Sequence, residues 1–233
     1  MNLKKGLLFF PIILVVIYFC AGIFYDAKNI IYWKPLLIPS FMIYAIVNNK
    51  KKLTLNYFLF VIFFYLGETL MLFWDNILFF RIALIASFFC YLSLVNLGYE
   101  SIKNKNLYTI PKGFTLFILV LNALFLVAIL YILISTIGDV YLNIILIFNA
   151  IVALILGATA VIYLGKITVR KSYYYFFGAF ALILNNVFVA IVTYFMDNVV
   201  LNTFDRLLHF TSFLLIYLFI IEDKKSNKID IIK

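Results

Sequence analysis

The sequence predicts an all-α membrane protein, a polytopic bundle of about eight transmembrane helices. Of the 233 residues, 67% are hydrophobic and 12% are charged, and the mean hydropathy is +1.12. Soluble domains contain about half apolar residues and about a quarter charged residues. A chain of this length could not cover so much apolar surface in a water-soluble fold, so the composition indicates a protein that lies in a bilayer.

The apolar residues are gathered in eight runs that short polar links separate. A helix rises about 1.5 Å per residue, so a run of about 20 residues crosses a hydrocarbon core of roughly 30 Å. The runs lack the alternation of barrel strands. No link is long enough for a soluble domain, so a single transmembrane domain over residues 1–233 is expected. The predicted helices are residues 6–25, 30–47, 55–74, 77–98, 114–134, 141–164, 173–195 and 203–221.

The first run follows Lys4 and Lys5 and therefore resembles a signal peptide. It is longer than the apolar part of a usual signal peptide, and no small-residue cleavage site follows it. We therefore expect residues 6–25 to remain as the first transmembrane helix.

The positive charges predict the orientation of the bundle. Fifteen of the 19 Lys and Arg residues lie at the two ends of the chain or in alternate links, in "NNKKKL", "ESIKNKNLYTIPK" and "GKITVRKS". Cytoplasmic loops carry the excess of Lys and Arg. Both termini should therefore be cytoplasmic, in a multi-pass protein of a bacterial inner (cell) membrane. Because topology accounts for the net charge of +9, no nucleic-acid partner is expected.

Glu68 is a carboxylate deep in the third apolar run. A charged side chain at the centre of a bilayer costs about 2.5–3.5 kcal/mol on insertion scales. Such residues usually face the interior of the bundle and mark a functional site. The alternative is that Glu68 bonds a neighbouring helix and serves only helix packing.

Asn185 and Asn186 form a second polar feature, in the seventh run. A buried amide is costly unless it is paired, and it often joins two helices. Glu68 lies thirteen residues after residue 55, and Asn186 lies thirteen residues after residue 173. Both runs start at the cytoplasmic side, so both side chains should lie about 20 Å from that side. The sequence thus predicts that the two features share one depth.

Two further polar residues have weaker functional signals. Lys34 lies at the outer end of the second run, where it could reach a phosphate or Glu68, or could act as an interfacial anchor beside Tyr32 and Trp33. His209 is the only histidine, and its place near the start of the last run favours a structural role. No metal site or cofactor is expected, because the chain has no His and Cys residues at ligand spacing, no P-loop and no G-x-G-x-x-G motif.

Three short motifs, in this order, resemble those of the YhhN-like lysoplasmalogenase family of integral membrane proteins, which have about eight helices. "WKPLLIP" (33–39) is similar to the family's Lys-Pro motif. "LGETL" (66–70) is similar to Gly-Asp-x-x-Leu, and "GAFALILNNVFVA" (178–190) is similar to Gly-Ala-x-x-Phe-x-x-Ser-Asp-x-x-x-Ala. With the helix count, the resemblance extends over most of the chain.

The chain departs from the family pattern at several polar positions. Glu68 replaces the first Asp and keeps a carboxylate, whereas Asn185 and Asn186 replace Ser-Asp and lose one. Phe88 stands where the family has a His, and Tyr217 stands where it has a Gln. The departures bear on the activity more than on membership of the family.

The resemblance implies hydrolysis of the vinyl-ether bond of a lysoplasmalogen to a fatty aldehyde and a glycerophospho-base. Glu68, Asn185 and Asn186 would be the catalytic residues, and Lys34 and Tyr65 would bind the lysolipid. A general acid must protonate the β-carbon, and a base must deliver water. An Asn can orient water but cannot be its base. The alternative is a non-catalytic lipid-binding or transport protein of the same fold, and the oligomeric state stays open.

Overall fold

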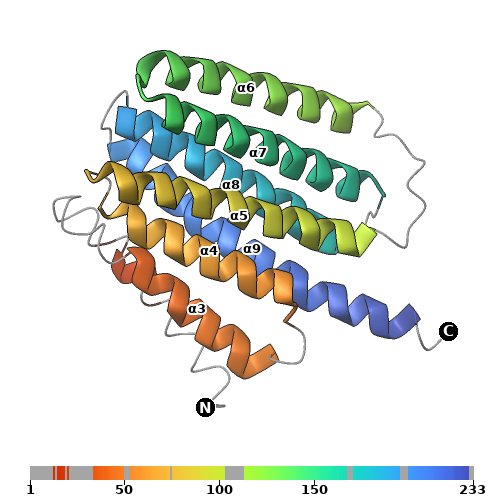
Figure 1. Cartoon of the computed structure of the whole chain (residues 1–233). Helices are drawn as coiled ribbons and strands as arrows, with labels where there is room; N and C mark the ends of the chain where they lie inside the picture. Colours follow the sequence, from red (N-terminus) through yellow and green to blue (C-terminus); the bar gives the residue numbers. More distant parts are fainter. Residues whose placement is uncertain are drawn as a thin grey trace.

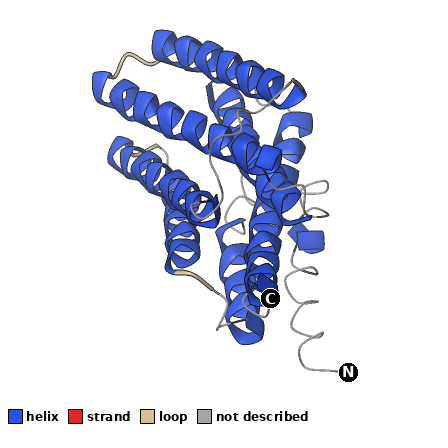
Figure 2. Cartoon of the chain, turned by 90° about the vertical axis from the view of Figure 1, so that its right-hand side faces the viewer, coloured by secondary structure: helices blue, strands red, loops and turns tan. Residues whose placement is uncertain are grey.

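The computed structural model of the chain describes residues 13, 15–18, 20, 34–49, 53–73, 75–102, 113–166, 170–194 and 199–230. Over these residues the protein is helical and contains no strand (Figure 2). The all-α prediction is therefore confirmed for the part of the chain that is described. Residues 13, 15–18 and 20 are helical, as expected, and the rest of the first predicted helix lies outside the described residues.

The other seven predicted helices are present. The helices are α3 (Lys34–Asn49), α4 (Leu55–Met71), α5 (Ile77–Ile102), α6 (Phe114–Thr136), α7 (Val140–Lys166), α8 (Arg170–Tyr194) and α9 (Val199–Asp230). The last helix continues well beyond the predicted end at residue 221. The polar tail contains no Gly or Pro before Asp230, so nothing in it interrupts the helix.

Five of the described helices, α5 to α9, are long and apolar enough to cross a membrane. Length and composition therefore define a multi-pass membrane protein. The remaining apolar helices are shorter, with 16 residues in α3 and 17 in α4. At about 1.5 Å per residue each spans roughly 25 Å, slightly less than a hydrocarbon core.

Local sequence signals set several helix ends. Pro35 lies in the first turn of α3, where a missing backbone N–H costs no hydrogen bond. Thr54 caps α4 through its hydroxyl, which accepts from the Tyr57 N–H at 3.3 Å. Asp139 caps α7, since its Oδ1 accepts from the Tyr141 N–H at 2.8 Å and from the Leu142 N–H at 3.0 Å.

The helices form a bundle in which α3 and α6 lie at opposite edges, with the other helices between them (Figure 1). The most extensive contacts join α8 with α9 and α4 with α5. Aromatic rings fill the interface of α4 and α9, where Phe60 and Phe64 each stack on Phe213 at 5.6 Å. This aromatic layer holds α4 and α9 side by side, and Glu68 lies one turn beyond it.

A close approach joins α5 and α8. The Tyr175 hydroxyl donates to the Leu94 carbonyl at 2.8 Å and is fully buried. The phenol reaches this position because Gly98 has no side chain, since a Cβ at Gly98 would overlap the ring. Residue 98 must therefore be small for the two helices to pack in this way.

Candidate functional site

Glu68 lies on α4 and turns into the bundle. Its side chain is 15% exposed, and its Oε1 is 3.6 Å from Nδ1 of His209 on α9. The separation is slightly longer than a hydrogen bond, so a small rotation of either side chain would bring the two groups into contact. The carboxylate of the third apolar run thus faces a titratable group from the last run.

His209 is held rigidly beside Glu68. The imidazole is 1% exposed and stacks on the Phe64 ring at a centroid distance of 4.8 Å. Phe64 precedes Glu68 by four residues, so both side chains lie on one face of α4 and meet the same residue of α9. The sequence favoured a structural role for His209, and its place beside Glu68 was the feature that sequence reasoning missed.

A cation lies one turn before His209 on the same helix. Arg206 is 9% exposed, and its guanidinium lies 5.3 Å from the centre of the Tyr18 ring. An Arg side chain stays charged in proteins. The N-terminal part of α9 therefore brings a fixed positive charge near the histidine.

Asn186 is bound to α5. Its Nδ2 donates to Ser87 Oγ at 3.2 Å and to the Tyr91 hydroxyl. The Gly67 backbone packs against α5 near Ser87, since a Cβ there would lie 4.0 Å from the Ser87 nitrogen. Gly67 is the neighbour of Glu68, so Glu68 and Asn186 lie at the same level along α5. This agrees with the depth that the sequence predicts for both.

Ser87 and Tyr91 were not singled out from the sequence. They are four residues apart in an otherwise apolar part of α5, and such a spacing places two side chains on one helix face. A polar pair at this spacing indicates a polar stripe inside the membrane. It is the signal that could have found them.

Asn185 lies on the side of α8 that packs against α9. It is fully buried, and neither atom of its amide group has a hydrogen-bond partner among the described residues. Gly178 on α8 packs against Leu215 and Ile216 on α9. The two helices run antiparallel, so Asn185, two turns after Gly178, lies opposite residues about two turns earlier on α9, near 208 and 209. Asn185 is thus near the level of His209. Because buried amides need partners, it can hold a polar atom of a bound molecule there.

The remaining predicted residues are separate from this cluster. Lys34 begins α3, but its side chain lies outside what the structure describes. The Tyr65 side chain is exposed, and the Tyr65 carbonyl accepts from the Thr69 hydroxyl at 2.8 Å. At the positions of the family's His and Gln, Phe88 contacts Phe148 and Tyr217 contacts Tyr44 through their rings. The described residues contain no group of side chains that could hold a metal.

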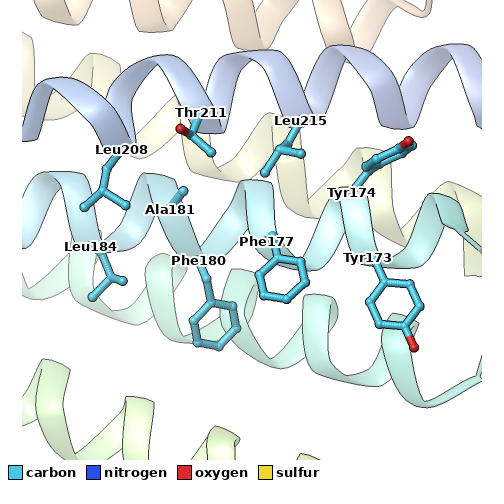
Figure 3. Close-up of a pocket in the computed structure, with 9 residues that line it drawn as sticks. All are labelled: Tyr173, Tyr174, Phe177, Phe180, Ala181, Leu184, Leu208, Thr211 and Leu215. Atoms are coloured by element: carbon cyan, nitrogen blue, oxygen red, sulfur yellow. The ribbon is translucent and has the colours of Figure 1, made fainter. Parts of the chain in front are cut away.

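A groove of about 430 Å³ lies between α8 and α9 (Figure 3). It is lined by aromatic and aliphatic side chains with one Thr, and neither Glu68, His209 nor Asn186 lines it. The apolar groove and the polar cluster are therefore separate features.

The fold and the polar cluster define a class: a multi-pass helical membrane protein with a carboxylate and an imidazole facing each other inside the bundle. No protein-family model, curated protein or solved structure matches the chain.

Proposed function

We propose that the protein is a lysoplasmalogenase-like hydrolase of the membrane. It would cleave the vinyl-ether bond of a lysoplasmalogen to a fatty aldehyde and a glycerophospho-base. The observation that carries the proposal is the 3.6 Å approach of Glu68 Oε1 and His209 Nδ1. The resemblance to the YhhN-like family adds support, because Glu68 stands at that family's carboxylate position.

The two facing groups suit acid-catalysed hydrolysis of a vinyl ether. Protonated Glu68 donates its proton to the β-carbon, so that the double bond becomes an oxocarbenium ion. Water then adds to the α-carbon while His209 accepts one of its protons. The resulting hemiacetal breaks its bond to the glycerol oxygen, which takes the hydroxyl proton as the aldehyde leaves. The proton on His209 passes to Glu68, and both groups return to their starting states.

In this proposal His209 replaces the second carboxylate of the family. Asn186 cannot accept a proton from water, and its amide already binds Ser87 and Tyr91. The Asn185 amide, which has no hydrogen-bond partner among the described residues, lies near the level of His209 and would orient the water. Lys34 and Tyr65 stay proposed as substrate-binding residues, with Lys34 near the phosphate.

We also propose eight crossings with both termini in the cytoplasm of a bacterial cell. Two contacts support this topology. At one end of the bundle Arg81, near the start of α5, pairs at 2.5 Å with Asp139 in the link after α6, and the charge rule places both residues outside. At the other end Asn56, near the start of α4, donates to Glu100, near the end of α5, at 2.9 Å, and the charge rule places both of these helix ends inside. Reporter fusions in the 137–139 link and after Lys233 should report opposite sides of the membrane, and an external C-terminus would contradict the topology.

Aldehyde release from an alkenyl lysolipid by purified protein tests the hydrolase proposal. General acid–base groups contribute about 10²–10⁴-fold to rates, so Glu68→Gln and His209→Gln should each lower turnover by about 10²-fold or more. Imidazole in the buffer should partly restore the turnover of the His209→Ala variant. Glu100→Gln is the matched carboxylate control, because Glu100 lies on the surface and binds Asn56, and it should keep wild-type turnover.

A non-catalytic lipid-binding or transport protein is the second candidate. The amide at the family's second carboxylate position and the separation of the groove from Glu68 favour it. Wild-type protein that releases no aldehyde would support this candidate. Turnover that survives Glu68→Gln would instead show that the proposed mechanism is wrong.

A further inference from the structure

The groove between α8 and α9 is elongated and apolar. Tyr173 and Tyr174 line one end, and Leu184 and Leu208 line the other (Figure 3). Along α8 the lining residues extend over residues 173–184, which at about 1.5 Å per residue corresponds to roughly 16 Å. The volume of about 430 Å³ falls in the range of small-molecule sites, roughly 300–1,000 Å³. The shape suits a hydrocarbon chain.

The groove opens away from the polar cluster. On α9 its lining residues Leu208, Thr211 and Leu215 form one stripe, whereas His209 and Phe213 turn toward α4. Phe177, in the middle of the groove, is 54% exposed. Both α8 and α9 are long and apolar enough to span the bilayer, so the open side of this groove faces lipid.

A cation lies at the tyrosine end. Arg170 is the first residue of α8, its side chain is exposed, and its guanidinium lies 5.9 Å from the centre of the Tyr174 ring. The guanidinium group matches the oxygens of a phosphate in a planar, two-pronged geometry. Lys166, the last residue of α7, and Lys171 of α8 add further positive charge to this part of the sequence. Basic sites between membrane helices recognise anionic headgroups.

We propose that this groove binds one anionic phospholipid. An acyl chain lies along α8 and α9 with its end toward Leu184 and Leu208, and the phosphate group lies against Arg170 beside the two tyrosines. The site goes beyond the proposed hydrolase activity and does not depend on it, because it shares no residue with the Glu68–His209 pair.

Native mass spectrometry of the purified full-length protein tests the site, with equal amounts of phosphatidylglycerol and phosphatidylcholine in the detergent. The wild type should retain one lipid, with phosphatidylglycerol preferred. Thr211→Trp, at an exposed position of the groove, should abolish retention by filling it. Arg170→Gln should keep one lipid but reduce the preference by about fivefold, since one cation near an anionic surface contributes roughly 1 kcal/mol.

Two matched variants control the experiment. Leu124→Trp adds the same ring on α6, at a side chain that is 65% exposed, and Lys51→Gln removes one charge from another basic link. Both should retain lipid as the wild type does.

Equal retention of the two lipids by the wild type, or unchanged retention by Thr211→Trp, would overturn the proposal. The proposal would also be overturned if the wild type had the mass of a dimer and Thr211→Trp had the mass of a monomer, because a second copy of the chain would then cover the groove. Leu215→Trp fills the same groove from a second position and should also abolish lipid retention. Equal melting temperatures of all variants show that they fold.

Discussion

Oε1 of Glu68 on α4 lies 3.6 Å from Nδ1 of His209 on α9, in the interior of the bundle. The two residues come from the third and the last apolar run of the sequence. Phe64 and Phe213 bring their helices together, and Phe64 stacks directly on the imidazole. The pair gives a carboxylate in an apolar helix a polar partner, and it places two proton-transferring groups at one point.

The first prediction concerns the state of this pair. His209 is the only histidine, so protein labelled with ¹⁵N-histidine gives imidazole signals from a single residue. Glu68→Gln should shift both ring nitrogen signals, because it removes the nearest carboxylate that the structure places at Nδ1. Glu100→Gln should leave them unchanged, since Glu100 binds Asn56 at another end of the bundle. Identical spectra for wild type and Glu68→Gln would show that the two side chains do not interact.

The second prediction concerns Asn186. Asn186→Leu should lower the free energy of unfolding by about 1–3 kcal/mol, because it leaves the Tyr91 hydroxyl and Ser87 Oγ without their shared partner. Denaturant unfolding in mixed micelles measures the difference. Thr159→Val is a matched control: among the described residues the Thr159 hydroxyl bonds only the Ile155 carbonyl of its own helix, at 2.7 Å, so a much smaller loss is expected.

Asn186→Asp separates stability from activity at the same position. The Tyr91 hydroxyl can donate to a carboxylate, so the contact between α5 and α8 should survive. In the proposed hydrolase His209 already serves as the base, so the variant should keep aldehyde release close to the wild-type value. If the protein only binds lipid, the variant should create no turnover. If Asn186→Asp turns over much more slowly than the wild type, at equal amounts of folded protein, the proposed roles of His209 as base and Asn186 as a helix contact are wrong.

The third prediction concerns the contact of α5 with α8. Gly98→Ala should destabilise the protein by about 1–3 kcal/mol, because the new methyl group overlaps the Tyr175 phenol and disturbs its bond to Leu94. Gly165→Ala, in α7, meets nothing within 4 Å and should be neutral or slightly stabilising. Equal unfolding curves for the two variants would show that α5 and α8 are not packed so closely.

The fourth prediction concerns pH. Backbone hydrogen bonding from Leu142, together with the Arg81 guanidinium, lowers the pKa of Asp139 below its ordinary value. The ionised form is therefore favoured in the folded protein, and its contribution to stability is complete above the ordinary pKa of about 4 and is lost as the pH falls through the lowered value. The melting temperature of the wild type should fall in this acidic window.

Asp139→Asn isolates that contribution. The amide oxygen can still cap α7, but the charge is absent, so the difference in melting temperature from the wild type should shrink as the pH falls below about 4. Asp75→Asn, at an exposed position of the link between α4 and α5, is the control. A difference between wild type and Asp139→Asn that stays constant with pH would contradict the prediction.

The sequence by itself determined the class of fold. Runs of apolar residues near the length of a bilayer predict membrane helices, and these runs correspond closely to α3 through α9. The same reasoning singled out Glu68, Asn185 and Asn186, because a polar side chain in an apolar run is costly wherever the helices pack. Their common depth also followed from sequence, since depth depends only on the distance from a helix end.

Only the tertiary structure decided which side chains meet. Apolar runs without a strong amphipathic stripe do not specify which helix lies beside which, because every face is compatible with lipid. The sequence therefore could not show that Glu68 faces His209 on α9 while Asn186 binds Ser87 and Tyr91 on α5. Those pairings depend on aromatic packing between α4 and α9 and on the close approach at Gly98, which are contacts between residues far apart in the chain.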